Sequence, residues 1–162
     1  MSEYTGCPGS RSFTMKEAGE GEEKAFRSPS RLTHWPIQLH LISPDAPQYR
    51  DADVLLAADC VAYAMGSFHE DYLKGRTLAI ACPKLDGNQD AYVAKIRSWF
   101  ETNSIKSLTV LIMQVPCCRG LIGLTALAMK DTDTKVPVRY AVVGFRGEII
   151  DEGEVSLEDL IW

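Results

Sequence analysis

The sequence lacks the features that would assign it to several common classes of protein. No apolar run approaches the roughly 20 residues that a membrane-spanning helix needs. No block of Lys and Arg is dense enough to neutralise several phosphates, and the net charge is -5. The first residues resemble neither an export signal nor an organelle signal. We therefore expect a cytoplasmic protein with no nucleic-acid or membrane partner.

The motif Cys-x-x-Cys is also absent, although the chain contains five cysteines. This absence argues against a thioredoxin-type motif, a zinc ribbon and the local cysteine runs of bacterial ferredoxins. Disulfides are disfavoured in a reducing compartment, so the thiols indicate metal or redox chemistry. Any site that several of these cysteines share must be assembled by the fold.

The composition is that of one ordinary globular domain, with 162 residues of which 46% are apolar and 24% charged. Residues 1–30 have few large apolar side chains and are rich in Gly, Ser and charge. We predict that they form a flexible N-terminal arm, which carries the short motif Cys7-Pro8-Gly9-Ser10. Residues 31–162 are predicted to form the folded domain.

Apolar runs alternate with helical spacings along the domain, which predicts an α/β fold. The expected strands are residues 37–42, 54–58, 77–81, 108–115 and 138–145, and the last of these continues through a turn at 146–147 into a short edge hairpin. The expected helices are residues 61–73, 89–103 and a segment from about 119 to 131. The predicted architecture is a single Rossmann-like or flavodoxin-like, mostly parallel sheet flanked by helices.

Four of the cysteines directly follow predicted strands. Cys60 comes after the strand 54–58, Cys82 after 77–81, and the pair Cys117 and Cys118 after 108–115. Because parallel strands joined by right-handed crossovers end at one edge of a sheet, these thiols are expected to converge there. Each cysteine also stands where a helix is expected to begin, and helix N-termini stabilise thiolates.

Four converging thiolates suit zinc or an iron–sulfur cluster. Structural zinc sites usually take their ligands from paired short spacings, whereas these cysteines are widely separated along the chain, which favours a cluster. Both members of the vicinal pair ligate, or one of them is a spare. Cys7 is an alternative ligand, a cap over the site or a free thiol of the N-terminal arm. Five thiols are too few for two all-cysteine cubanes.

Several segments resemble the C-terminal cysteine-rich domain of small iron–sulfur-binding proteins of anaerobic bacteria and archaea, usually described as 4Fe-4S ferredoxins. The matching segments are Ala57-Ala58-Asp59-Cys60, Cys82-Pro83-Lys84-Leu85-Asp86, Val115-Pro116-Cys117-Cys118, Trp35-Pro36-Ile37-Gln38-Leu39, Phe68-His69 and Cys7-Pro8-Gly9-Ser10. The resemblance covers about residues 32–150 and implies a cysteine-rich α/β domain of anaerobic redox metabolism. Relatives often carry a separate two-cluster ferredoxin module, and its Cys-x-x-Cys runs are absent from this chain.

Three further residues lie close to the cysteines in sequence. His69 is suited to serve as a ligand, a proton donor or a hydrogen-bonding partner of a ligand, and Lys84 to balance the charge of a cluster. Both are candidate cofactor-binding residues. The structural alternatives are that His69 is an ordinary surface or core histidine and that Lys84 is a solvated lysine in a turn. Asp59 is suited to cap the next helix.

The leading hypothesis is therefore a protein that binds one iron–sulfur cluster, most simply [4Fe-4S], through Cys60, Cys82, Cys117 and Cys118. It would transfer electrons to a redox partner such as a ferredoxin or an oxidoreductase, or reduce a small molecule at the cluster. A zinc-holding regulatory or scaffold module is the first alternative. The second is a thiol enzyme that uses Cys82 or Cys118 as nucleophile and His69 as base. A further alternative is a homodimer in which two chains share one cluster.

Overall fold

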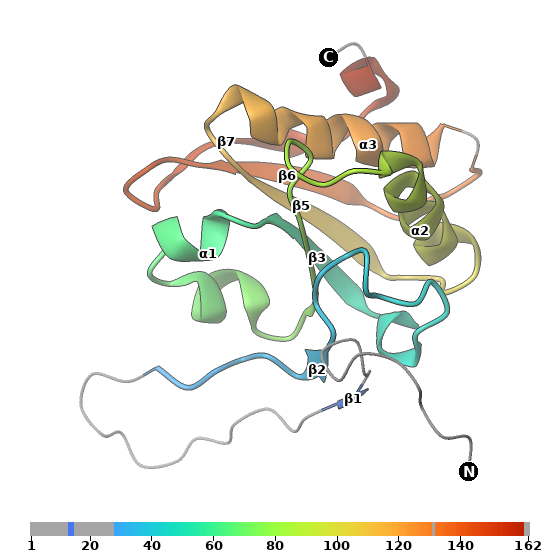
Figure 1. Ribbon diagram of the computed structural model, residues 1–162, viewed down its shortest axis with the longest axis horizontal. Helices are drawn as coiled ribbons and strands as arrows, with labels where there is room; N and C mark the ends of the chain where they lie inside the picture. Colours follow the sequence, from blue (N-terminus) through green and yellow to red (C-terminus); the bar gives the residue numbers. More distant parts are fainter. Residues whose placement is uncertain (1–12, 15–27, 131, 161–162) are drawn as a thin grey trace.

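A mostly parallel five-stranded sheet forms the centre of the molecule (Figure 1). The computed structural model describes residues 13–14, 28–130 and 132–160. The strands of the sheet are β3 (Asp53–Ala58), β4 (Thr77–Ala81), β5 (Ser107–Met113), β6 (Val138–Val143) and β7 (Ile149–Glu154). A separate antiparallel pair joins β1 (Phe13–Thr14) to β2 (His34–Trp35).

The strand order is β4-β3-β5-β6-β7. All neighbours pair in parallel except β6 and β7, which form an antiparallel hairpin at the edge. Counted in chain order this is the flavodoxin-like arrangement 2-1-3-4-5, and its topological switch point lies between β3 and β5. The predicted fold class is confirmed, as are the parallel strands predicted at residues 54–58, 77–81, 108–115 and 138–145 and the edge hairpin.

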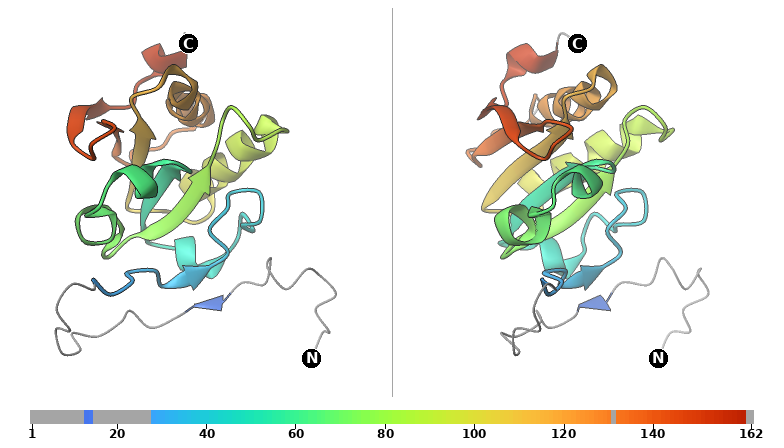
Figure 2. Two further views of the ribbon diagram at one scale, coloured as in Figure 1. Left: turned by 60° about the vertical axis from the view of Figure 1, so that its left-hand side comes forward. Right: turned by 90° about the vertical axis from the view of Figure 1, so that its left-hand side faces the viewer.

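Helices cover both faces of the sheet (Figures 1 and 2). Right-handed crossovers place α1 (Val61–Ala64) and the π-helical turn His69–Leu73 on one face. The same rule places α2 (Gln89–Glu101) and α3 (Gly120–Met129), which pack against each other, on the opposite face. In the described residues no helix is both long enough and apolar enough to cross a membrane.

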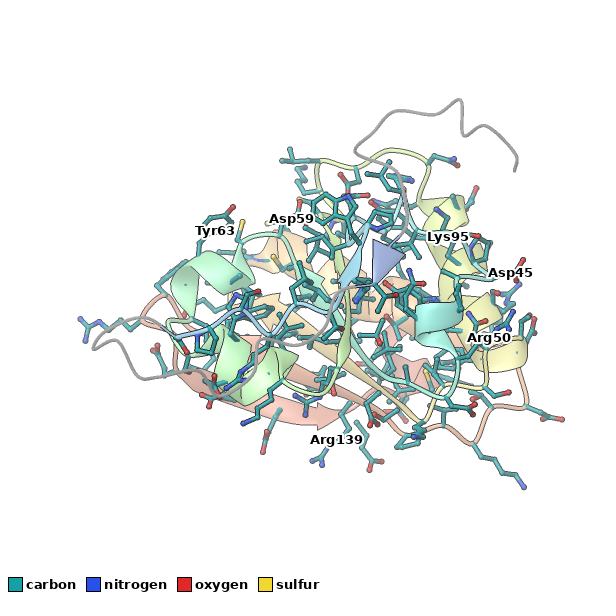
Figure 3. All side chains as sticks on the ribbon, turned by 90° about the horizontal axis from the view of Figure 1, so that it is seen from below. Asp45, Arg50, Asp59, Tyr63, Lys95 and Arg139 are labelled. Carbon is teal, nitrogen blue, oxygen red and sulfur yellow. The ribbon has the colours of Figure 1, made fainter. Side chains whose placement is uncertain are left out.

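The strand expected over residues 37–42 does not form. Gln38 makes one isolated parallel bridge to Ile80 of β4, and the chain then turns. It turns because the backbone N–H groups of Leu41 and Ile42 both donate to the Gln38 carbonyl oxygen, at 2.9 and 3.2 Å. Lys95 of α2 fixes the turn by donating to the carbonyl oxygens of Leu39 and His40 (Figure 3).

The prediction of a single helix over residues 61–73 is also wrong, because the structure has two short helical segments there, Val61–Ala64 and His69–Leu73, separated by a break. Met65 has the extended dihedral angles φ -103° and ψ 100°, and Gly66 and Ser67 follow it before the π-helical turn begins. Glycine is a poor helix former, so the break lies at the weakest point of the pattern. The apolar spacing is nevertheless satisfied, since Val61, Met65 and Phe68 are all buried.

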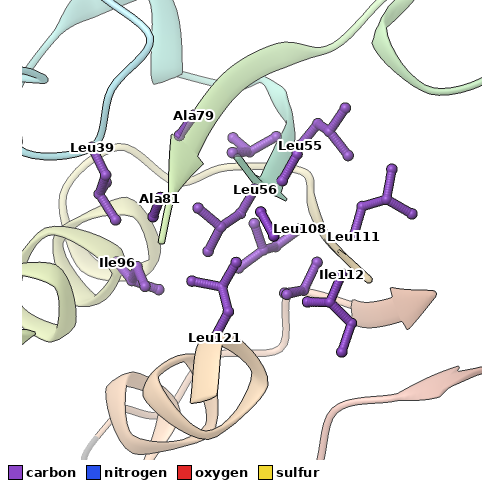
Figure 4. Close-up of a cluster of buried hydrophobic side chains, with 14 of the residues drawn as sticks. Leu39, Leu55, Leu56, Ala79, Ala81, Ile96, Leu108, Leu111, Ile112 and Leu121 are labelled. Carbon is purple, nitrogen blue, oxygen red and sulfur yellow. The ribbon is translucent and has the colours of Figure 1, made fainter. Parts of the chain in front are cut away.

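The core lies on both faces of the sheet, and the continuous apolar runs of β3, β4 and β5 contribute buried side chains to both of them (Figure 4). Leu55, Leu56, Leu108 and Leu111 are fully buried. Such runs are expected of parallel strands that are covered on both faces. This core holds the ends of the three cysteine-bearing strands in place.

Candidate functional site

The loops that follow β3, β4 and β5 meet at the carboxyl edge of the sheet. We call residues 59–60, 82–86 and 114–118 the thiol rim. Ala58 pairs with Ala81 in the β3–β4 ladder, and the Asp59 N–H donates to the Ala81 carbonyl oxygen at 3.2 Å. Because β5 pairs in parallel with β3 on its other side, the cysteines after all three strands lie at this edge, as the sequence predicted.

Three of the rim thiols interact with one another. Cys118 lies in the 3-10 turn Pro116–Arg119 and is buried, whereas Cys60 and Cys117 are exposed. Burial is the main cause that raises the pKa of the Cys118 thiol to about 11, and Cys117 and Cys60 raise it further. A hydrogen bond with the backbone of Met113 acts in the opposite direction. Cysteines that follow β3 and β5, more than 55 residues apart along the chain, therefore lie on the two sides of the switch point, near enough for their charges to interact.

The raised pKa of Cys118 bears on the thiol-enzyme hypothesis. A nucleophilic cysteine needs a depressed pKa, since the thiolate is the reactive form. The Nδ1 atom of His69 accepts a hydrogen bond from the Arg31 backbone N–H at 3.1 Å, so this nitrogen is already occupied. Burial of Cys118 therefore favours its neutral thiol form in the metal-free protein.

Cys82 is held at the rim by a carboxylate. Oδ2 of Asp86 accepts hydrogen bonds from the Cys82 backbone N–H at 2.8 Å and from Nε2 of Gln38 at 3.2 Å. It also accepts a hydrogen bond from the hydroxyl of Tyr92 on α2. Burial, followed by this hydrogen bond, raises the pKa of Tyr92. One oxygen atom therefore joins the Cys82 loop, α2 and the turn at Gln38.

Asp59 does not cap α1 as the sequence predicted, because the capping position is Cys60 and no side-chain cap bond forms. In the described part of the chain, the buried Oδ1 atom of Asp59 has no hydrogen-bond partner. Burial is the main cause that raises the pKa of Asp59, and the charge of Asp86 adds to it. Asp59 thus places a second carboxyl group beside the thiols.

The remaining candidate residues lie in different places. Lys84 is exposed in the turn after Cys82, and His69 lies in the wall of a pocket beside the rim. Cys7 falls outside the described residues. Within the described ranges, no three His, Cys, Asp or Glu side chains are arranged closely enough to hold a metal ion. The thiols share one edge, but their loops are not drawn together around one point.

Sequence reasoning missed the part that Asp86, Gln38 and Tyr92 play. Tyr92 lies on the buried, apolar face of α2, a position typical of core packing. A usable signal was the spacing of Cys82 and Asp86, because an aspartate in the turn after a strand can bond back to the backbone of a nearby residue. The contact with Gln38 depends on the turn of residues 38–42, which sequence periodicity did not reveal.

The Rossmann-like domain family model matches residues 46–161, which include the whole central sheet and all four rim cysteines. The chain belongs to the Rossmann-like domain family. An uncharacterized protein of Archaeoglobus fulgidus is 25% identical over 133 residues, which are 78% of this chain and 93% of that protein. Neither description mentions iron, sulfur or ferredoxin. No solved structure matches the chain. Membership of this family thus accounts for the fold of the chain, and the residues of the thiol rim are the basis for inferring its chemistry.

Proposed function

We propose that this Rossmann-like domain binds one iron–sulfur cluster, most simply [4Fe-4S], at the thiol rim and acts as a redox protein. The ligands we propose are Cys60, Cys82, Cys117 and Cys118, with Cys7 as an alternative. The observation that carries the proposal is that cysteines follow the carboxyl ends of β3, β4 and β5, three neighbouring parallel strands that include the switch point. Open α/β sheets bind their ligands at this position.

The donor set fits a cluster in its chemistry, since thiolates are the usual ligands of iron–sulfur centres. The spacing of the donors requires movement, because the described loops do not yet converge. Cys60 and Cys117 are exposed, at the N-cap of α1 and in the 3-10 turn after β5, so they can approach a cluster without opening the core. Asp86 keeps the start of the Cys82 loop in place. We therefore expect cluster binding to close the rim loops while the sheet stays unchanged.

A bound cluster would supply one-electron storage, and the chain would set its surroundings. Lys84, in the loop after Cys82, can offset the negative charge of a thiolate-ligated cluster. Cys118 lies almost entirely inside the protein and would anchor the cluster on its buried side. The exposed Cys60 and Cys117 would leave the other side close to solvent, where a second redox centre can approach.

Exposed apolar side chains near this edge favour a protein partner. Tyr63 after β3, Leu85 after β4 and Phe145 after β6 are 93%, 84% and 65% exposed. Exposed large apolar side chains gathered around one feature are typical of contact surfaces. The partner we propose is a redox protein such as a ferredoxin or an oxidoreductase.

Leu85 tests this surface, because it is exposed and does not line the pocket described below. The substitution Leu85→Ser should slow electron transfer to the partner at least several-fold in stopped-flow measurements. An unchanged rate would argue against this surface.

The function is tested by purifying the protein anaerobically from iron-replete cells and measuring iron, zinc and acid-labile sulfide. We expect a brown protein with about four iron atoms and about four sulfides per chain. Its broad visible absorption should bleach on reduction. About one zinc per chain without sulfide would instead select the zinc module. A colourless protein without either metal would overturn both metal hypotheses.

A further inference from the structure

A pocket of about 230 Å³ lies beside the rim, under α1 and the π-helical turn. Its walls include Leu32, Phe68, Leu78 and Ile80, and Ala62 of α1 is also part of the lining. Asp59 and Tyr63 lie near each other on this side of the molecule (Figure 3). An apolar cavity of about 150 Å³ is sufficient to bind benzene. The pocket therefore has room for a six-membered ring with one small substituent.

Few polar groups line this apolar pocket, and their chemistry limits what can bind. The Oγ atom of Ser30 already accepts a hydrogen bond from the Leu32 N–H at 3.2 Å. Asp59 also lines the pocket, and no hydrogen bond to its carboxyl group is formed by the described residues; its Oδ1 atom is buried, so a ligand would have to reach the carboxyl group through Oδ2. The Nδ1 atom of His69 accepts the Arg31 N–H, so a neutral His69 ring carries its proton on Nε2 and can donate from there.

We propose that the pocket is a binding site for a small molecule with an apolar ring or branched body and a head group that donates a hydrogen bond to Asp59. A primary amide satisfies both polar residues, because its NH₂ donates to Asp59 and its oxygen accepts from His69. An ammonium group satisfies Asp59 alone. A carboxylate has no hydrogen to donate to Asp59, so it would leave the Asp59 carboxyl group without a partner. The lining contains no cysteine, although it shares Asp59 with the thiol rim.

The proposal is tested on the metal-free full chain by titration with four small probes, followed by NMR or calorimetry. The probes are benzamide, benzylamine, benzoate and toluene, which share a ring and differ in the head group. We expect benzamide to bind with a Kd of about 1 mM or tighter. Benzylamine should bind more weakly, toluene more weakly again, and benzoate not at all. Equal binding of benzoate and benzamide would overturn the assigned chemistry.

Two variants locate the site. Asp59→Ala should weaken benzamide binding about tenfold and leave toluene binding unchanged, because only the amide uses the carboxyl group. Ala62→Phe should block all the probes by placing a ring in the pocket. Ala94→Phe on α2 is the matched control, since Ala94 is also an exposed helical alanine but lies outside the lining. Loss of binding in Ala94→Phe, or unchanged binding in Ala62→Phe, would overturn the site.

These outcomes are separate from those of the metal analysis. A protein that binds iron but no probe would retain the proposed function and lose the pocket. A protein that binds benzamide but neither iron nor zinc would retain the pocket and lose the proposed function. Measuring both properties on one preparation therefore distinguishes the two failures.

Discussion

Replacing Cys60 by alanine should lower the iron content of the anaerobically purified protein at least tenfold and remove its visible absorption. The expected effect is large because Cys60 follows β3, which lies between the other two cysteine-bearing strands. Its charge acts on Cys118, beyond β5, and its strand pairs directly with β4, which ends at Cys82. Cys60 is therefore the thiol that connects the two halves of the proposed ligand set.

The Cys60→Ala variant should fold like the parent protein. Cys60 is exposed, so its truncation leaves no cavity in the core. The thermal midpoint of metal-free Cys60→Ala should thus stay within a few degrees of the parent value. Iron and sulfide determination measures the effect, and calorimetry of the metal-free protein checks the fold. A variant that retained full iron content would exclude Cys60 as an essential ligand and remove the main support for the rim site.

Cys7→Ala gives the matching comparison on a thiol of the N-terminal segment. Unchanged iron content would show that the rim cysteines suffice. A loss as large as that of Cys60→Ala would place Cys7 among the ligands and make one of the vicinal pair, Cys117 or Cys118, the spare. Both outcomes are compatible with a cluster, and they decide which four thiols hold it.

The features predictable from the sequence are those that depend on short-range pattern and on general rules of topology. The apolar runs at residues 54–58 and 77–81 lie on β3 and β4 because both faces of a parallel strand are buried. The common edge for the cysteines followed from the handedness of crossovers. These rules need no knowledge of which side chains touch.

The features that were not predictable depend on contacts between distant segments. Residues 37–42 read as a strand, yet the chain turns because two amides share the Gln38 carbonyl and Lys95 of α2 holds the turn. The pocket likewise depends on several segments at once, including the stretch before β2, the strand ends and the broken helix after Cys60. Periodicity describes one segment at a time, so it cannot reveal such arrangements.

Replacing Asp86 by alanine should have the second large effect. We expect it to lower both the stability of the protein and its iron binding. In Asp86→Ala the Cys82 N–H, the Tyr92 hydroxyl and the Gln38 side chain lose their common acceptor in a partly buried position. Unsatisfied donors of this kind cost about 1 to 3 kcal/mol each, and partial access of water reduces the total to about 3 kcal/mol. In a chain of this size, that loss lowers the thermal midpoint by about 10 °C.

The same change should also act on the metal site, because Cys82 is one of the donors that Asp86 holds. Asp86→Asn keeps an acceptor oxygen in the same position and should recover most of the stability and the iron content. Asp90→Ala is the matched control, since Asp90 is an exposed aspartate in the first turn of α2 and should cost at most about 1 kcal/mol.

Calorimetry and iron analysis of Asp86→Ala, Asp86→Asn and Asp90→Ala, made side by side, separate a positioning role from a purely structural one. If Asp86 only stabilises the fold, Asp86→Ala will melt early yet bind iron fully at temperatures where it is folded. If it positions Cys82, iron content falls under those same folded conditions and returns in Asp86→Asn. A thermal midpoint equal to that of Asp90→Ala would contradict both roles, because the three donors would then have found other partners at no cost.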